Sequence, residues 1–111
     1  MTSIYMKGCQ IQMSENWKSI MIEGDIGSEG GIVLADEEYK EECRITLEKC
    51  ERYHAITCGV YGDMLHTAFC SEEEANSKYE AMKAELKEFV DALIEDSQAR
   101  SSFYAQFTSK Y

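Results

Sequence analysis

Residues 44–70 read RITLEKCERYHAITCGVYGDMLHTAFC, and this stretch decides the fold. It contains three runs rich in β-branched and aromatic residues: Arg44–Lys49, Tyr53–Tyr61 and Met64–Cys70. Short runs of this kind, separated by turn-forming residues, predict an antiparallel meander of three strands. Gly62-Asp63 is a favoured two-residue hairpin loop, so we expect the second and third strands to be joined there.

The predicted loop fixes a register, because side chains alternate between the two faces of a strand. Val60 then pairs with Leu65, and Ile56 pairs with Phe69 and, on its other side, with Leu47. This register gathers apolar side chains on one face: Ile45, Leu47, Ile56, Cys58, Val60, Leu65 and Phe69. The opposite face carries Arg44, Thr46, Glu48, Thr57, Gly59, Tyr61, Met64, His66 and Ala68.

A long amphipathic helix is expected to follow the meander, over about residues 72–96. Ser71 and Glu74 have the spacing of a capping box. Apolar residues then recur in steps of three and four, with the stripe widening toward its end: Ala75, Tyr79, Met82, Leu86, Phe89, Val90, Leu93 and Ile94. A helix-mediated dimer is one interpretation, but the widened stripe suits a sheet better. We therefore expect this helix to cover the apolar face of the meander.

Upstream segments are expected to add strands to the same sheet. Partial alternation runs through residues 3–13, and residues 17–23 and 31–35 look like strands, whereas the acidic residues 36–43 suggest a loop or a helical turn. No segment before Ser71 has room for a crossover helix, so the sheet should be mostly antiparallel.

The chain therefore predicts a single α+β domain over residues 1–111. Its sheet, at about residues 3–70, is a mostly antiparallel five- to six-stranded meander, and one long C-terminal helix packs on one face. Residues 101–111 form a short terminal helix or tail, in which Phe103, Phe107 and Tyr111 recur every four residues.

Charge limits the possible partners. The formal net charge is −10 at pH 7, and nine acidic and three basic residues fall between Glu72 and Asp96. Nucleic acid and anionic membranes carry charge of the same sign, so we exclude both as partners, whereas a basic protein is compatible. An acidic helix face that only keeps the protein soluble is the simpler interpretation. No secretory leader and no apolar run of membrane length is visible, so we expect a cytoplasmic protein.

The five cysteines and two histidines form no recognisable metal or redox motif. No cysteine pair has the two-residue spacing of a redox or zinc motif, so we expect reduced and mostly buried thiols. His66 and Cys70 share a strand face, but strand residues four apart are separated by about 13 Å, too far to chelate one metal. We expect neither a metal nor a cofactor.

The glycine-rich segment at residues 24–31, GDIGSEGG, invites two ligand hypotheses. It lacks the Lys-Ser/Thr ending of a P-loop, and Asp25 and Glu29 would repel a phosphate. As a calcium loop it offers Gly27 where a carboxylate is needed, and its neighbours look like strands rather than helices. We interpret it as a flexible hairpin loop, and the sequence does not determine whether it binds anything.

The polar face of the meander holds the candidates for a small-ligand site. The predicted register sets His66 beside Arg44 and opposite Gly59. With two threonines these residues could hold an anionic ligand: Arg44, Thr46, Thr57 and His66. An ordinary solvated sheet face is the simpler interpretation. The 21 acidic residues guarantee carboxylate neighbours by chance, so no catalytic residue is predicted.

The leading functional hypothesis is a non-enzymatic interaction module that binds another protein, itself included. An inhibitor or immunity protein directed at a basic enzyme would be of this kind, by analogy of fold and charge. Aromatic side chains with no evident intramolecular partner usually mark an interface, so we expect a homodimer. Its interface candidates are Tyr61, Met64, Phe103, Phe107 and Tyr111. A monomer whose tail folds back on its own sheet is the alternative.

The second functional hypothesis is a small ligand-binding or minimal catalytic domain. It would use the polar patch around Arg44 and His66. A concave pocket that encloses both residues would favour this hypothesis, and a flat or covered face would favour the interaction module.

Overall fold

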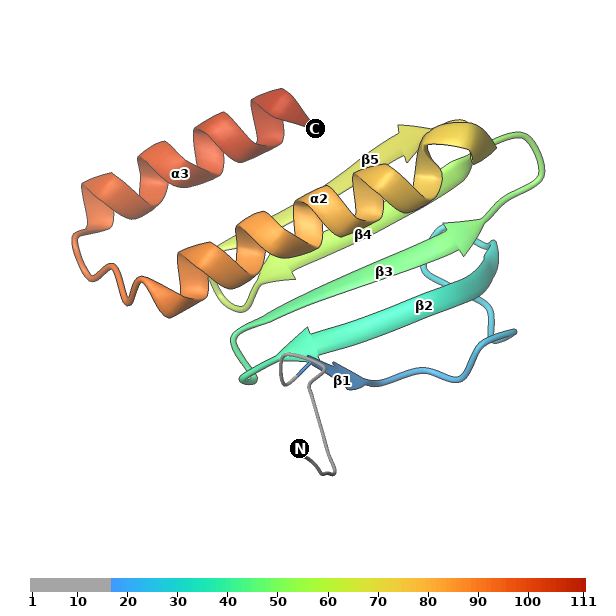
Figure 1. The fold of residues 1–111 in the computed structure, drawn as a ribbon, viewed down its shortest axis with the longest axis horizontal. Helices are drawn as coiled ribbons and strands as arrows, with labels where there is room; N and C mark the ends of the chain where they lie inside the picture. The colour runs from blue at the N-terminus through green and yellow to red at the C-terminus, as the bar shows by residue number, and fades with distance from the viewer. Residues whose placement is uncertain (1–16) are drawn as a thin grey trace, which may run out of the picture.

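The computed structural model describes residues 17–111 as one antiparallel sheet with two helices on the same side (Figure 1). The strands follow one another in sequence order: β1 (Trp17–Ser19), β2 (Ile32–Tyr39), β3 (Cys43–Lys49), β4 (His54–Val60) and β5 (Met64–Cys70). Two helices come after the sheet: α2 (Glu72–Asp91) and α3 (Ser97–Lys110). The predicted α+β class, the meander and the long helix after it are confirmed. The strand expected at residues 3–13 lies outside the described residues.

The second strand is longer than the sequence predicts. The acidic residues 36–43 were expected to form a loop or a helical turn, but β2 continues to Tyr39 and only residues 40–42 turn. The carboxylates of this run have partners across the sheet and on α2. Asp36 pairs with Arg44, and Glu37 pairs with Lys83. Glu38 accepts a hydrogen bond from the Tyr61 hydroxyl. An acidic run can therefore belong to a strand, because the carboxylates within the strand find cations or hydrogen-bond donors in the folded protein.

The register between β3 and β4 is the predicted one. Leu47 pairs with Ile56, and Ile45 pairs with Cys58. All four side chains are buried beneath the helices. The alternation of apolar and polar residues along these two seven-residue strands was sufficient to predict the register between them.

The predicted register between β4 and β5 is wrong by one residue. The loop has three residues, Tyr61–Asp63, so Val60 pairs with Met64 instead of Leu65, and Ile56 pairs with Ala68 instead of Phe69. Gly62 takes a positive φ of 81° in this loop. The amide of Asp63 donates to the carbonyl of Val60 at 2.9 Å, which closes the turn. A third loop residue turns every side chain of β5 to the other face.

The corrected register exchanges large side chains for small ones beneath the helices. Leu65 is 80% exposed and Phe69 is 55% exposed, whereas Ala68 and Cys70 are buried. Small residues on β5 leave room for the bulky side chains that α2 contributes to the core: Tyr79, Met82, Leu86, Phe89 and Val90. The register predicted from the apolar pattern is wrong because the largest apolar side chains of this strand point away from the core.

The long helix forms as predicted but ends earlier. The backbone amide of Ser71 donates to the carboxylate of Glu74 at 3.4 Å, as in a capping box. The helix ends at Asp91, and Leu93 adopts a positive φ of 54° with 78% of its surface exposed. Ile94, rather than Leu93, packs against the core.

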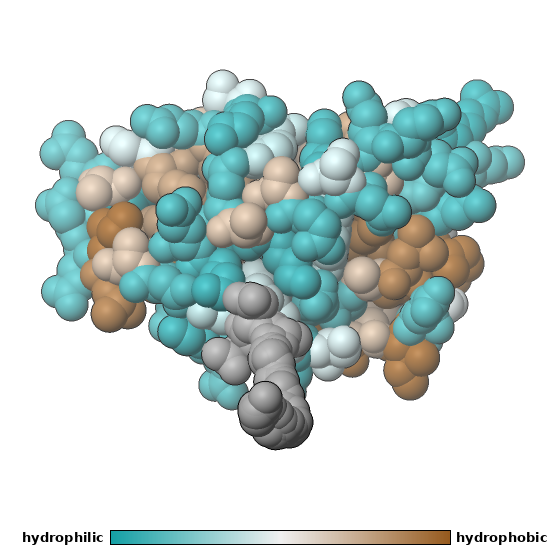
Figure 2. Space-filling model, viewed as in Figure 1, coloured by the Kyte–Doolittle hydropathy of each residue, from teal (hydrophilic) through white to brown (hydrophobic). Residues whose placement is uncertain are grey.

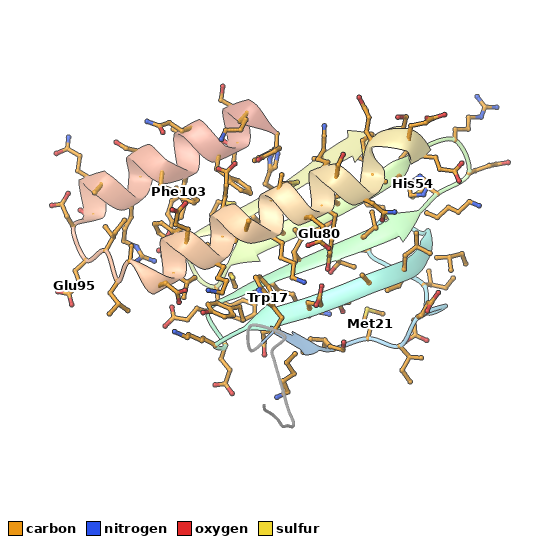
Figure 3. All side chains as sticks on the ribbon, in the orientation of Figure 1. Trp17, Met21, His54, Glu80, Glu95 and Phe103 are labelled. Atoms are coloured by element: carbon orange, nitrogen blue, oxygen red, sulfur yellow. The ribbon has the colours of Figure 1, made fainter. Side chains whose placement is uncertain are left out.

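The C-terminal aromatics have a home within their own chain. Phe107 on α3 is 1% exposed, Phe103 stacks on Phe89 of α2 at 4.3 Å between ring centroids, and Tyr111 lies 5.0 Å from Phe107. Figure 3 shows Phe103 between the two helices. Phe103, Phe107 and Tyr111 were predicted as interface candidates because the sequence showed no intramolecular partner for them, and the structure supplies one. Helix α3 places these aromatic side chains against the second half of α2.

The surface on the helix side is mostly hydrophilic, with hydrophobic patches toward two sides of the outline (Figure 2). Among the described residues, neither helix has the length and apolar character that crossing a membrane requires.

Candidate functional site

The candidate site lies on the face of the sheet opposite α2 and α3, which we call the open face. Four polar side chains occupy successive strands of this face, because Asp36, Thr46, Thr57 and Thr67 pair in turn from β2 to β5. The next row along the strands holds Glu38, Arg44, Gly59 and Leu65. The open face therefore carries polar rows beside exposed apolar side chains.

A pocket of about 420 Å³ is hollowed into the open face. Its wall combines the candidates Arg44, Thr46 and Thr57 with apolar side chains of β4, β5 and the segment after β1, among them Met21, Tyr61 and Leu65. Three of the four predicted ligand-site residues are thus brought together in one concavity. The volume falls in the range of small-molecule pockets, and it also suits a single large side chain of a protein partner.

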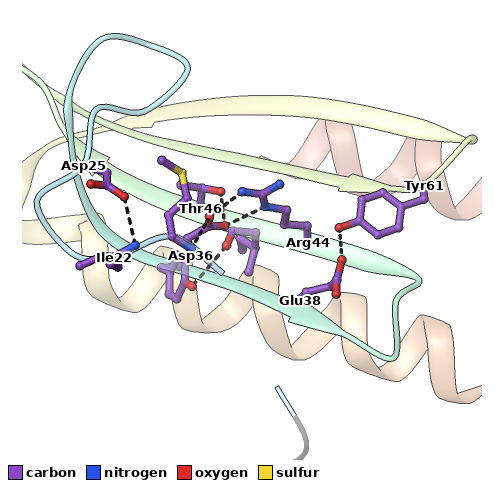
Figure 4. A network of polar contacts seen from close by, with 10 residues as sticks. Ile22, Asp25, Asp36, Glu38, Arg44, Thr46 and Tyr61 are labelled. Atoms are coloured by element: carbon purple, nitrogen blue, oxygen red, sulfur yellow. Dashed lines mark hydrogen bonds and ion pairs between the residues drawn. The ribbon is translucent and has the colours of Figure 1, made fainter. Parts of the chain in front are cut away.

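Asp36 does not line the pocket itself but binds three residues that do, namely Met21, Arg44 and Thr46. Its carboxylate accepts two hydrogen bonds from Arg44, from Nε at 2.9 Å and from Nη2 at 2.6 Å, and a third from the Thr46 hydroxyl at 2.8 Å (Figure 4). The backbone amide of Met21 adds a fourth at 3.2 Å. Burial alone would raise the pKa of Asp36, but the bonds from Arg44 and Thr46 hold that pKa below its ordinary value. Asp36 is therefore an ionised, positioning carboxylate.

Arg44 presents part of its guanidinium to solvent. Its side chain is 38% exposed, whereas the side chain of Asp36 is fully covered. The ion pair uses Nε and Nη2, and Nη1 makes no hydrogen bond to another described residue. The hydrogen bond to Asp36 raises the pKa of Arg44, so the guanidinium stays charged. A ligand or a partner could accept a hydrogen bond from this free end.

His66 does not belong to the pocket. The prediction placed it beside Arg44, but the corrected register pairs it with Cys58 and turns it to the helix side. Its ring lies 6.4 Å from that of Phe107, and its Nε2 is buried without a hydrogen-bond partner among the described residues. Arg44 and His66 are therefore separated by the sheet. The pocket loses the histidine on which a minimal catalytic site depended.

Two other predicted interface residues sit at the edge of the pocket. Tyr61 is about half exposed, and its hydroxyl donates to the carboxylate of Glu38. Burial and this hydrogen bond raise the pKa of Tyr61 to about 12. Met64 was predicted on the open face, but it packs against the core on the helix side and also contributes to the pocket wall.

The glycine-rich segment is held on the open face by a buried glutamate. The carboxylate of Glu48 is fully buried and accepts hydrogen bonds from the backbone amides of Glu29 at 3.2 Å and Gly31 at 2.9 Å. A Cβ on Gly27 would lie 2.6 Å from Glu48 Oε1, so a larger residue there would have to displace this carboxylate. The amides that a phosphate would need are thus already used by a side chain of the same protein.

Glu48 and Asp36 are the residues that sequence reasoning missed. Glu48 was assigned to the correct face but not to a role, and Asp36 was assigned to a loop or a helical turn. Extending the alternation of β2 through the acidic run would have put Asp36 beside Thr46. Nothing in the sequence pattern indicates that Glu48 receives the amides of a segment 17 to 19 residues away.

The described cysteines and histidines form no metal site or reactive thiol centre. Within residues 17–111, no group of three or more His, Cys, Asp or Glu side chains could hold a metal ion. Cys43 and Cys58 are buried, and burial raises the pKa of both thiols to about 12. A thiol with so high a pKa is a poor nucleophile near neutral pH.

No protein-family model, no curated protein and no solved structure matches this chain.

Proposed function

We propose that this protein is a non-enzymatic interaction module that binds a basic protein through the open face of its sheet. The observation that carries the proposal is the pocket, which lies on the sheet face opposite both described helices. Exposed apolar side chains accompany it on β5 and on the segment between β1 and β2: Ile22, Ile26, Leu65 and Phe69. Contiguous apolar surface rimmed by polar groups is characteristic of protein interfaces.

Charge supports a basic partner. The net charge of −10 disfavours acidic partners, and exposed carboxylates flank the open face in the β1–β2 segment, at Glu23, Asp25 and Glu29. A partner with lysines or arginines around an apolar side chain would complement both the apolar pocket and the carboxylates beside it. Inhibitors and immunity proteins of basic enzymes work through such complementarity, and this role is the specific form of the proposal.

We also propose that the protein acts in the cytoplasm and self-associates. An odd number of cysteines, with no spacing typical of a disulfide framework, fits a reducing compartment. Self-association draws little support from Phe103, Phe107 or Tyr111, because Phe107 is buried within the chain and the other two side chains are half-buried against the core. It is supported instead by the exposed side chains of β5.

Site-specific photo-crosslinking in the producing cells tests the proposal. A photoreactive residue at Met21 sits in the pocket wall, and a matched one at Glu80 sits on the exposed side of α2. We expect a discrete adduct with a basic protein from position 21 and none from position 80. The absence of an adduct at position 21, or equal adducts at both positions, would contradict the proposal.

A second candidate function is the binding of a small ligand in the same pocket. It is favoured by one observation: Nη1 of Arg44, which bonds to no other residue of the described part of the chain, belongs to a side chain that lines a largely apolar pocket. The ligand would have an apolar body and a hydrogen-bond acceptor for Nη1. The fully buried Asp36 neutralises much of the arginine charge, so the acceptor can be a neutral carbonyl as well as a carboxylate. Native mass spectrometry of protein purified from its host would show such a ligand, and loss of that mass in Arg44→Lys would assign it to the pocket.

A further inference from the structure

Strand β5 is an open edge without the usual protection. Among the described strands it pairs only with β4, through seven residues in continuous register. Its sequence, MLHTAFC, contains no Asp, Glu, Lys or Arg and no proline. Soluble proteins usually protect a regular edge strand with charges, proline or a bulge, because free amides and carbonyls pair readily with another strand. The edge of β5 can therefore pair with another strand.

We propose that a second copy of this chain pairs with β5 in antiparallel fashion, around a two-fold axis at Thr67. This inference deepens the proposed self-association and rests on it. Residues that face each other in an antiparallel pair lie on the same face of the sheet, so the axis must pass through a residue and not between two residues. An axis at Thr67, the middle of Met64–Cys70, is the one that pairs all seven residues.

In this register the two most exposed side chains of the strand contact each other across the two copies. It sets Leu65 opposite the partner's Phe69, and Phe69 opposite the partner's Leu65. These two residues are 80% and 55% exposed in the single chain. Tyr53 lies 5.2 Å from Phe69 between ring centroids and extends the same apolar surface. Cross-strand pairs of aromatic and aliphatic side chains are the units that stabilise antiparallel sheets.

The distribution of charge favours a second copy of the chain as the partner of the β5 edge. The basic partner is expected at the open face instead. Two copies with a net charge of −10 each repel one another over most of their surfaces. The strand β5 contributes no Asp, Glu, Lys or Arg side chain, and His66 points to the helix side. Two copies can therefore pair along Met64–Cys70 without opposing carboxylates within the strand, and the strand itself offers no carboxylate to attract a basic segment.

The position of α3 is compatible with this pairing. The helix starts beside the hairpin loop, where Arg100 and Tyr104 bond to the carboxylate of Asp63. Its ring contact with β5 is the one between Phe107 and His66, in the hairpin half of the strand. Figure 1 shows α3 beside that half and on the helix side. A two-fold axis at Thr67 sets the second α3 beside the other half of the paired strands.

The first test uses the symmetry at Thr67. In Thr67→Lys each new lysine faces its own copy, and in Thr67→Glu each new glutamate does the same. We expect light scattering to show a dimer for the wild-type chain and a dissociation constant at least roughly tenfold higher for each variant alone. Mixing the two variants should restore a heterodimer, because the lysine then faces the glutamate. The control Leu93→Lys, at a residue 78% exposed on another part of the surface, should dimerise like the wild type.

A second test uses only exposed positions, so it does not depend on how Thr67 variants fold. Leu65→Lys with Phe69→Glu places each lysine opposite the partner's glutamate and should stay dimeric. Leu65→Lys with Phe69→Lys should be monomeric. A monomeric wild-type chain, dimers in all of these variants, or monomers that mixing does not rescue would overturn the proposal. Photo-crosslinking at Met21 in the monomeric Thr67→Glu chain separates the two functions, because Thr67 does not line the pocket and an adduct there supports the open face whatever happens at β5.

Discussion

The two faces of the sheet are stabilised by different physical means. The helix side is a close-packed apolar core, in which Ile45, Ile56 and Leu86 have no exposed surface. The open side is organised by two buried carboxylates, Asp36 and Glu48, that bind backbone amides and an arginine. Apolar burial is non-directional and fills space, whereas hydrogen bonds to carboxylates fix a few atoms and leave space between them. This difference explains why the pocket lies on the open side.

The largest difference between the faces should appear in a matched pair of leucine substitutions. Leu86 is fully buried and Leu65 is 80% exposed. We expect Leu86→Ala to lower the free energy of unfolding by about 2–5 kcal/mol, because it leaves a cavity in the core. Leu65→Ala should change it by less than about 0.5 kcal/mol. Urea denaturation at a protein concentration that keeps both variants monomeric measures the two values, and similar losses would show that the β5 register is wrong.

Removal of the Glu48 carboxylate should release the segment that covers part of the open face. Glu48→Ala leaves the amides of Glu29 and Gly31 without their acceptor, which we expect to cost about 1–3 kcal/mol. Glu48→Gln is the matched control, because its amide oxygen can still accept one of these bonds. Hydrogen exchange at Gly31 should accelerate strongly in the alanine variant and only modestly in the glutamine variant. Unchanged exchange at Gly31 in both variants would show that this carboxylate does not hold the segment.

Acid should weaken the open face through Asp36. Its pKa lies below the ordinary 3.8 in the folded protein, so the unfolded chain binds the proton more readily. The stability contributed by Asp36 is therefore complete above about pH 5 and is lost as pH falls through 3.8 and then through the folded-state pKa. Asp63, Glu85 and Asp91 have lowered pKa values as well and add to the same trend.

The variant Asp36→Asn isolates the contribution of this one carboxylate. It should be less stable than the wild-type protein at pH 7, and the difference should shrink as the pH approaches 3. Urea midpoints across that range give the comparison. A constant difference at every pH would mean that the ionised form of Asp36 has no special role in the folded state.

The smallest expected contrast concerns two tyrosine hydroxyls on opposite faces. Tyr79 is buried on the helix side and donates to Glu37 at 2.7 Å, whereas Tyr61 is half exposed and donates to Glu38. Tyr79→Phe should cost about 1–2 kcal/mol, since Glu37 is partly buried and loses a partner. Tyr61→Phe should cost no more than about 0.5 kcal/mol, because water replaces the hydroxyl. An equal cost at both sites would imply that the open face is as dry as the core.

The elements that the sequence predicted well are those with strong local periodicity. The helix stripe from Ala75 to Phe89 and the β3–β4 pairing follow from side-chain spacing alone. The register of β5 could not be predicted in the same way, because Leu65 and Phe69 outweigh Ala68 and Cys70 in any pattern that places the largest apolar residues inside. Loop length decided the face, and the choice between two and three residues at Gly62 depends on backbone hydrogen bonds that the sequence does not reveal.

The candidate site was partly predictable for a similar reason. Arg44, Thr46 and Thr57 lie on β3 and β4, where the register was correct, and the structure brings them into one pocket. His66 lies on β5, so the one-residue error carried it to the wrong face. Asp36 and Glu48 act through contacts with distant parts of the chain, namely Arg44 and the backbone of residues 29–31, and local patterns do not report such contacts.

The double variant Leu65→Lys, Phe69→Lys tests most directly whether the outward side of β5 serves association and not folding. Its free energy of unfolding and its dimer dissociation constant should be measured on the same preparation, the first at a concentration where wild type and variant are both monomeric. The account predicts an unfolding free energy within about 0.5 kcal/mol of the wild-type value and loss of the dimer. An unfolding free energy lower by several kcal/mol, or a dimer that persists, would contradict it.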